Sequence, residues 1–400
     1  MNPNDGPALC SGGTALIMTG GGARAAYQVG VLRALSELFA PGAPCPFPII
    51  CGTSAGAVNA AVLATDADDF RRAVRRLMTV WKNIHVDRVY RADPVGAIHN
   101  SARWIGTVLT GGVFNVKPIS LLDNTPLKQM LERDLDFSAI ERHIGAGHLS
   151  AFSVTCSGYS SGQSVTFYQG QPGVEGWKRA RRIGLAMTIQ PEHVLASSAL
   201  PFIFQPVRIN REYFGDGSMR QIAPVSPALH LGATKVMVIG VGRQLAPDGE
   251  RVHTNGWPSL AQIAGHALNS IFLDSLEVDL ERLQRINRTI DLIPGEILER
   301  TRYPLRRVDI RVLRPSEDLD KIALNYAQEL PRTIRTLLAM VGGLKRNAAT
   351  LLSYLLFERG YARALIRLGY KDTIARKDEL AEFLHVAEPA RPGAADAAAA

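Results

Sequence analysis

The stretch FPIICGTSAGAVNAAVLA, residues 47–64, joins three kinds of local sequence. The apolar run 47–51 has the length and composition of a buried strand. Small residues at 52–56 then favour a tight turn, and the alanine-rich stretch 57–64 is typical of a closely packed helix. Strand, turn and helix in this order form the repeating unit of a parallel sheet, so the stretch predicts an α/β fold.

The same unit occurs once before. TALIMT at 14–19 is apolar and runs into GGGAR at 20–24, after which residues 25–39 place apolar side chains at helical spacing. Two consecutive units predict a mainly parallel sheet with crossover helices. Ligands of such sheets bind beyond the carboxyl ends of the strands.

Further strands are predicted along the first part of the chain. Residues 150–156 and 164–168 flank a Gly/Ser turn and predict an antiparallel hairpin. Short strands are predicted at 207–209 and 212–214, and KVMVIGV at 235–241 reads as a buried strand. A polar stretch rich in proline and glycine follows.

Beyond that stretch the periodicity is mostly helical, over 260–290, 322–341 and 348–368, with one alternating strand at 308–313. The apolar faces of these helices favour packing onto the rest of the protein, with membrane contact as the alternative for 348–368.

Four hundred residues exceed one ordinary domain. We predict a catalytic α/β domain at 14–245, a mostly helical C-terminal region at 257–386, and a disordered tail of low complexity at 387–400. No stretch supplies about 20 uninterrupted apolar residues, so no spanning helix is predicted. The start of the chain lacks the pattern of an export signal.

Composition narrows the classes of partner. The chain is 46% hydrophobic, and 45 Lys and Arg against 37 Asp and Glu give a net charge of +8, which favours anionic partners. Three basic clusters lack the signatures of nucleic-acid binding, so we interpret them as solvated helix faces and expect no nucleic-acid partner. The clusters are Arg71/Arg72/Arg75/Arg76, Lys178/Arg179/Arg181/Arg182 and Arg302/Arg306/Arg307/Arg311.

Four scattered cysteines, Cys10, Cys45, Cys51 and Cys156, form neither a disulfide framework nor a CxxC metal motif. We therefore expect a reducing, cytoplasmic location with peripheral membrane association, and neither metal nor cofactor.

GTSAG at 52–56 fits the Gly-x-Ser-x-Gly nucleophile elbow, in which a sharp strand-to-helix turn presents the serine oxygen above the sheet. Ser54 is the predicted nucleophile, and the start of the following helix would help to stabilise negative charge. The alternative is an ordinary turn in which Ser54 caps the helix.

GGGAR at 20–24 follows a strand and precedes a helix, so its backbone N–H groups suit an oxyanion hole. A P-loop would need Gly-Lys-Ser/Thr, and a dinucleotide site would need a third glycine at the position of Ala25; both are missing. Arg24 is expected to hold an anionic headgroup, or else to be a surface or packing arginine.

A serine nucleophile needs a base. His230, His253 and His266 lie in no recognisable motif and are interpreted as incidental. Asp216, flanked by Gly215 and Gly217, is the better candidate, but a carboxylate must contact the serine in a desolvated pocket to act as a base.

These motifs together resemble the patatin-like phospholipases over roughly residues 14–230. GGGAR at 20–24, GTSAG at 52–56, ASSALP at 196–201 and Asp216-Gly217 occur in that family's order and approximate spacing. Ala25 and Ser218 depart from the usual pattern, which has glycine after the arginine and Gly or Ala after Asp-Gly.

The resemblance implies a three-layer α/β/α fold and a Ser-Asp dyad without histidine. It makes Ser54 the nucleophile, Asp216 the base, Gly21 and Gly22 the oxyanion donors, and Arg24 a neighbour of the phosphate. The implied activity is that of a phospholipase A or lysophospholipase, which hydrolyses acyl esters of phospholipids or related lipids through an acyl-enzyme.

Two other functions stay open at this stage. One is a catalytically silent lipid-binding or regulatory protein on the same fold. The other is an acyltransferase, against which Thr53 argues, because the elbows of malonyl-transfer enzymes carry histidine before the serine. The sequence does not indicate an oligomeric state.

Overall fold

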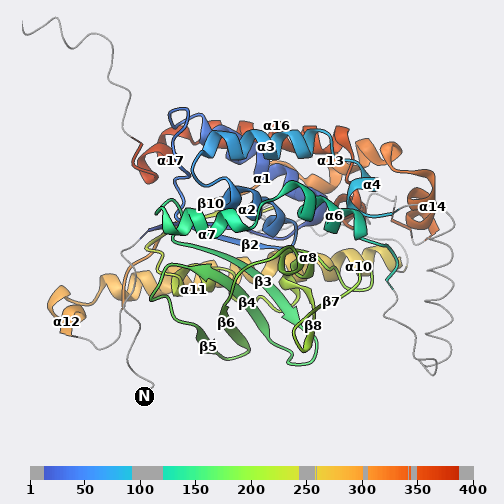
Figure 1. The fold of residues 1–400 in the computed structure, drawn as a ribbon. Coiled ribbons are helices and arrows are strands. Elements are labelled where there is room, and N and C mark those ends of the chain that lie inside the picture. Colours follow the sequence, from blue (N-terminus) through green and yellow to red (C-terminus); the bar gives the residue numbers. More distant parts are fainter. Residues whose placement is uncertain are drawn as a thin grey trace, which may run out of the picture.

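One mixed sheet of ten strands organises the protein (Figure 1). The computed structural model describes residues 13–91, 120–242, 257, 259–300, 305–340, 342–343 and 349–386. Strand order is β10-β9-β1-β2-β3-β4-β6-β5, with β8 paired to both β3 and β7. The strands are β1 (Thr14–Met18), β2 (Ile49–Thr53), β3 (Ala151–Gly158), β4 (Ser164–Gly170), β5 (Trp177–Arg179), β6 (Arg182–Ala186), β7 (Val207–Ile209), β8 (Glu212–Asp216), β9 (Lys235–Ile239) and β10 (Asp309–Leu313).

The five strands β10, β9, β1, β2 and β3 run parallel to one another. The hairpin partner β4 and the strand β8 are both antiparallel to β3. The predicted mainly parallel sheet and the predicted hairpin are therefore confirmed, and the carboxyl ends of β1 and β2 meet at one edge.

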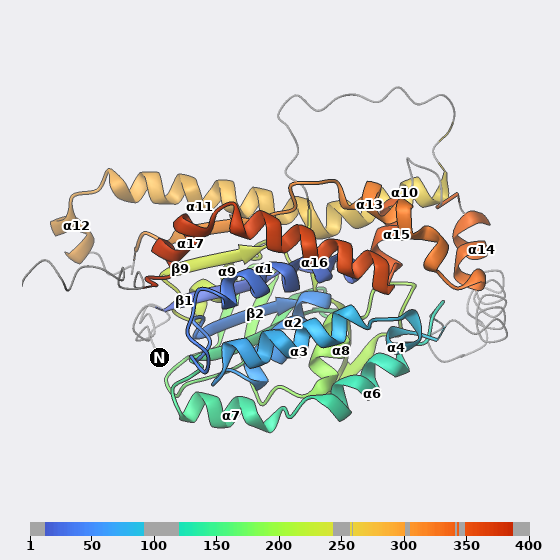
Figure 2. The same cartoon turned by 90° about the horizontal axis from the view of Figure 1, so that it is seen from above.

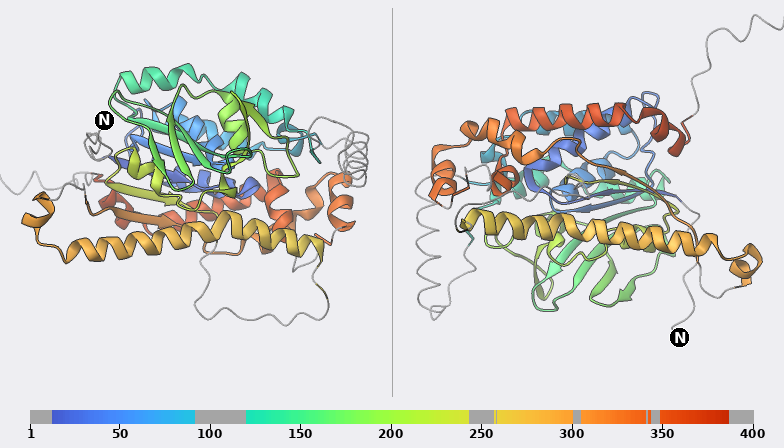
Figure 3. Two further views of the ribbon diagram at one scale, coloured as in Figure 1. Left: turned by 90° about the horizontal axis from the view of Figure 1, so that it is seen from below. Right: turned by 180° about the vertical axis from the view of Figure 1, so that it is seen from behind.

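Side chains of β1 alternate between two cores, as expected for a strand covered on both faces. Leu16 and Met18 belong to the larger core, which includes residues of α1, α2, α3 and α16. Ala15 and Ile17 belong to the smaller core, which includes Leu276 and other residues of α11. Figures 2 and 3 show α1 and α16 over one face and the rod formed by α10 and α11 across the other. The fold is thus a three-layer α/β/α arrangement.

The described helices follow the chain between and after these strands. They are α1 (Ala26–Ser36), α2 (Ala55–Thr65), α3 (Phe70–Lys82), α4 (Val86–Val89), α6 (Thr125–Asp134), α7 (Ser138–Gly145), α8 (Pro191–Ser197), α9 (Ser226–His230), α10 (Leu260–Asn269), α11 (Ser275–Asp291), α12 (Gly295–Arg300), α13 (Leu319–Tyr326), α14 (Arg332–Met340), α15 (Ala349–Leu355), α16 (Arg359–Ile374) and α17 (Lys377–Phe383). A π-helical turn over Ser270–Asp274 joins α10 to α11. In the part of the chain that the structure describes, none of the helices combines the length and apolar character needed to cross a bilayer.

The C-terminal region completes both the sheet and the core. Strand β10 pairs in parallel with β9, and α16 packs along α1. The two helices approach closely where Gly30 faces the carbonyl of Ile366 and Gly369 faces the carbonyl of Tyr27. The boundary between the catalytic and C-terminal regions therefore stays a prediction. The predicted tail at 387–400 and the start of the chain lie outside the described residues.

Two stretches that were each predicted to form one continuous helix are divided in the structure, so the predicted continuity is wrong. The stretch 322–341 is divided into α13 and α14, with Pro331 immediately before α14, because proline lacks the N–H that a continuous helix needs. The stretch 348–368 is divided into α15 and α16 by a non-helical segment at 356–358.

The basic cluster around Arg181 was expected on a helix face and lies instead on the hairpin of β5 and β6. Its three-residue strand β5 is too short to show a period-two pattern in the sequence. The cluster around Arg72 does lie on a helix, α3, and Arg72 and Arg76 form ion pairs with Asp66.

Candidate active site

Ser54 occupies the sharp turn between β2 and α2. Its φ of 55° and ψ of −131° are unusual for a residue other than glycine, so the surrounding structure must hold this conformation. The flanking glycines permit the turn: a Cβ on Gly52 would lie 2.5 Å from the Cα of Ala57, and one on Gly56 would clash with the carbonyl of Met18. The Ser54 side chain makes no capping hydrogen bond to α2, which argues against the helix-cap alternative.

Asp216 reaches the same edge of the sheet at the end of β8. Residue Cys156 of β3 is its register partner, and β3 in turn lies beside β2, which leads into Ser54. The following Gly217 has no room for a side chain, because a Cβ there would clash with the carbonyl of Thr155. The backbone N–H of Asp216 donates to the carbonyl of Ala199 at 2.9 Å.

The Asp216 carboxyl is completely buried, and this burial raises its pKa to about 6. Interactions with the Ser54 side chain and with the backbone N–H and hydroxyl of Ser218 lower the pKa and limit the rise. Oδ1 accepts the Ser218 N–H at 2.9 Å. A carboxylate with a raised pKa is a better proton acceptor than one in water.

The segment 196–201 forms hydrogen bonds with the backbone N–H groups of both Ser54 and Asp216. The hydroxyl of Ser197 accepts the backbone N–H of Ser54 at 2.8 Å and donates to the carbonyl of Thr155 at 2.6 Å. The ASSALP motif marked this segment in the sequence but predicted no role for Ser197. The Ser197 hydroxyl bridges the turn after β2 and the backbone of β3. Such a contact between segments far apart in the sequence is visible only in the folded protein.

The glycine-rich loop lies beside Ser54. Gly22, at φ 56°, lines the same pocket as Ser54, whereas Gly21, at φ 159°, faces the side chain of Val241. The carbonyl of Tyr354 packs against Gly22 on its other side and leaves no space for a Cβ. Donation from Gly21 and Gly22 to an oxyanion stays a prediction.

Arg24 points away from that pocket. Its side chain is 4% exposed, which excludes a surface arginine, and its guanidinium forms an ion pair with Asp320. Nε donates to Ser353 at 2.8 Å, and the guanidinium carbon lies 4.1 Å from the centroid of the Tyr354 ring. Arg24 thus packs against the C-terminal region, and its role at a headgroup stays a prediction.

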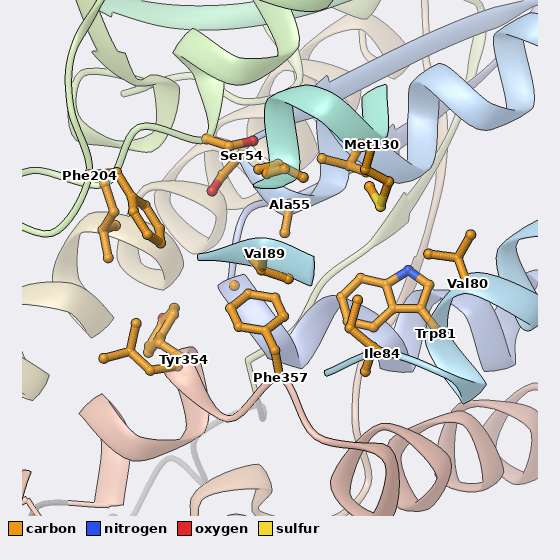
Figure 4. Close-up of a pocket in the computed structure, with 16 residues that line it drawn as sticks. Ser54, Ala55, Val80, Trp81, Ile84, Val89, Met130, Phe204, Tyr354 and Phe357 are labelled. Atoms are coloured by element: carbon orange, nitrogen blue, oxygen red, sulfur yellow. The ribbon is translucent and has the colours of Figure 1, made fainter. Parts of the chain in front are cut away.

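A narrow apolar pocket opens beside Ser54 (Figure 4). Its walls come from α2, α3, α6, the loop after α8 and the segment around α15. Among the lining side chains are Val58, Trp81, Met130, Phe204, Leu355 and Phe357. Such a lining suits an alkyl chain.

Two of the three histidines considered as alternative bases lie within the described residues, and the absence of a catalytic histidine stays a prediction. His230 stacks on Trp177, with ring centroids 4.7 Å apart, and burial lowers its pKa to about 4. His266 lies on α10 and lines a different cavity, and His253 lies outside the described residues. Within the described ranges, no group of three or more His, Cys, Asp or Glu side chains is arranged to hold a metal ion.

The model of the patatin-like phospholipase family matches residues 16–229, which is more than half of the chain. The chain belongs to the patatin-like phospholipase family. Ser54 and Asp216 both lie inside the matched region, whereas Tyr354, Leu355 and Phe357, which line the same pocket, lie beyond it.

Two known proteins give further comparisons. Lysophospholipase nte1 from Aspergillus terreus (strain NIH 2624 / FGSC A1156) is 50% identical over 60 residues, which is 15% of this chain and 4% of the fungal protein. This chain therefore matches only a small part of that relative's length. Among solved structures, VipD from Legionella pneumophila aligns with 90% of this chain and 67% of its own, at 12% identity and a TM-score of 0.31.

Proposed function

We propose that this patatin-like phospholipase is a serine hydrolase of lipid acyl esters, with Ser54 as nucleophile and Asp216 as the single general base. The observation that carries the proposal is that a strained, uncapped serine lines an apolar pocket and interacts with a fully buried carboxyl whose pKa is raised. Strain and a perturbed pKa at one point of a cavity are typical of a catalytic site.

Acylation begins when Asp216 accepts the proton of the Ser54 hydroxyl as the serine oxygen attacks the ester carbonyl. The negative charge that develops on the carbonyl oxygen is stabilised by the N–H groups of Gly21 and Gly22 and by the positive end of α2. When the intermediate collapses, the ester C–O bond breaks, and the departing alcohol takes the proton from Asp216. The acyl group is then esterified to Ser54.

Deacylation repeats these steps with water. Asp216 accepts a proton from the water as its oxygen attacks the acyl-serine, and the proton then passes to Ser54 as the carboxylic acid leaves. Because the pKa of Asp216 is about 6, the carboxyl is mostly ionised at neutral pH and able to accept a proton.

Active-site labelling tests the proposal directly. A fluorophosphonate probe should label the wild-type protein covalently, and peptide mass spectrometry should place the label on Ser54. The Ser54→Ala variant, which fits the same turn, should remain folded by circular dichroism and take no label. An unlabelled but folded wild-type protein would instead support the silent lipid-binding function.

We also propose that the protein meets its substrate at a membrane surface. A net charge of +8 favours an anionic bilayer, and attraction near such a surface is worth about 1 kcal/mol per basic residue. Phe202, 76% exposed, lies between Leu200 and Phe204 of the pocket and would enter the lipid layer. Co-sedimentation with anionic vesicles should weaken between roughly 50 and 500 mM salt. If the protein bound neutral and anionic vesicles equally at all salt concentrations, its charge would not contribute to membrane binding.

A further inference from the structure

We propose that the wall of the acyl pocket is completed by residues 354–357, and that Phe357 within this wall selects acyl chains by their length. The inference rests on the proposed lipid acyl hydrolase function and specifies its substrate further. It assigns a substrate-contacting role to a segment outside the family-matched region 16–229.

Phe357 is part of an aromatic wall across the pocket from Ser54 (Figure 4). Its ring stacks on Trp81, with centroids 6.3 Å apart and planes inclined by 26°, and meets Tyr90 edge-on at 6.2 Å. Tyr90 in turn contacts Phe204 at 5.9 Å. The rings of Trp81, Phe204 and Phe357 line the pocket and come from α3, from the loop after α8 and from the C-terminal region, so an alkyl chain entering from Ser54 would meet all three parts of the chain.

The main chain of this segment is attached to the family-matched region at two points. On one side, Gly22 packs against the carbonyl of Tyr354. On the other side, the hydroxyl of Tyr90 donates to the carbonyl of Leu355 at 3.0 Å. Residues 354–357 therefore have a fixed position relative to the glycine-rich loop at 20–24.

A buried polar cluster strengthens this attachment. Arg24 donates to the hydroxyl of Ser353, which also donates to Asp320 at 2.7 Å, and Asp320 forms the ion pair with Arg24. Thr350 donates to the second carboxylate oxygen of Asp320 at 2.6 Å. Ser353 directly precedes the pocket wall, and Arg24 ends the glycine-rich loop, so movement of α15 would disturb both.

The local backbone explains why the ring of Phe357 faces inward. The helix α15 ends at Leu355, and the N–H groups of Phe357 and Glu358 donate to carbonyls only two residues earlier, at 2.9 Å each. The chain turns there before α16 begins at Arg359. Because α16 is packed tightly on α1, the turn is held at both ends and Phe357 forms a rigid surface. A rigid wall discriminates between chains by size.

Hydrolysis of p-nitrophenyl esters from C4 to C16 tests this role. Phe357→Ala enlarges the pocket, so the ratio of kcat/KM for C12 over C4 should rise at least about fourfold, the equivalent of burying one further methylene group. Phe383→Ala is the matched control: it removes a phenyl ring that is also buried in the C-terminal region but does not line the pocket. Its ratio should equal that of the wild type.

An unchanged ratio in a folded Phe357→Ala protein, or an equal change in Phe383→Ala, would overturn the inference. Phe357→Leu, a smaller truncation, provides the same comparison if the alanine variant does not fold.

Ligand binding separates this inference from the hydrolytic mechanism. Calorimetric titration of Ser54→Ala with octanoate and laurate measures chain-length preference without catalysis, and Ser54→Ala/Phe357→Ala should bind laurate relatively better by the same fourfold or more. If this shift occurs while the wild-type protein hydrolyses no ester, the pocket assignment holds and the proposed reaction fails. If neither protein binds a fatty acid, the pocket assignment fails.

Discussion

Arg24 and Asp320 form an ion pair across 296 positions of the sequence. Arg24 follows the glycine-rich loop, and Asp320 belongs to α13, so the pair joins the loop beside the nucleophile to the C-terminal region. Arg24 also donates to the Ser353 hydroxyl of α15, and Asp320 accepts hydrogen bonds from Thr350 and Ser353 of the same helix. The loop geometry and the position of the C-terminal helices are therefore coupled.

Removing the charge of Arg24 should destabilise the protein. Arg24→Met leaves Asp320 without its cation, and because the Asp320 side chain is 24% exposed we expect at least about 2 kcal/mol, less than the 3–5 kcal/mol typical of a fully buried pair. Arg33→Met is the control, since its pair with Glu37 is exposed on both sides and worth less than about 1 kcal/mol. Urea unfolding compares the two, and equal effects would contradict the coupling.

Asp216→Asn should lower activity and raise stability in neutral solution. The rate should fall by about 10² or more, because Asn accepts no proton. A raised pKa in the folded state contributes stability that is complete below the unfolded value, near 4, and is lost as pH rises through about 6. The variant, which stays neutral, should therefore exceed the wild type by up to about 3 kcal/mol at pH 8.

Thermal unfolding at several pH values measures this difference. The advantage of Asp216→Asn should shrink toward zero near pH 4. If Asp216→Asn were less stable than the wild type at pH 8, the hydrogen bonds to the Asp216 carboxylate would fully offset the cost of burying its charge. Single substitutions of His230 or His266 should leave the rate nearly unchanged.

Ser218→Ala should move the acid limb of the pH–rate profile to higher pH. The Ser218 hydroxyl and N–H both favour the ionised form of Asp216. The variant keeps the N–H and loses the hydroxyl, so the pKa of Asp216 rises and the rate at pH 6 falls more than the rate at pH 8. Profiles of kcat/KM for a short ester measure the shift. A uniform loss at all pH values would mean that Ser218 acts on geometry alone.

Gly30→Ala should weaken the packing of α16 on α1. A methyl group at Gly30 would overlap the carbonyl of Ile366, so the helices must separate, and a cost of about 1–3 kcal/mol is typical of overpacking. Gly145→Ala, at the end of α7, meets nothing within 4 Å and should be neutral or stabilising by up to about 1 kcal/mol. Denaturant unfolding of both variants provides the comparison, and equal stabilities would refute the close approach.

Much of the fold could be predicted because β1, β2 and β9 are short apolar runs with a glycine at or within two residues of their carboxyl ends. The nucleophile elbow and the Asp216-Gly217 motif could also be recognised, because each places glycine where neighbouring backbone leaves no room for a Cβ atom. The pocket wall could not be recognised. Phe357 and Trp81 are ordinary apolar residues in sequence, and their rings stack only because long-range contacts of the folded chain place the segment after α15 beside α3.

The parallel pairing of β10 with β9 and the packing of α16 on α1 have a consequence for the order of assembly. During synthesis the N-terminal part of a chain emerges first and begins to fold first. Ser54 and Asp216 are therefore made well before the residues that close their pocket. A growing chain would hold its nucleophile over an incomplete cavity, and it could retain an acyl chain only after Phe357 and α16 had left the ribosome.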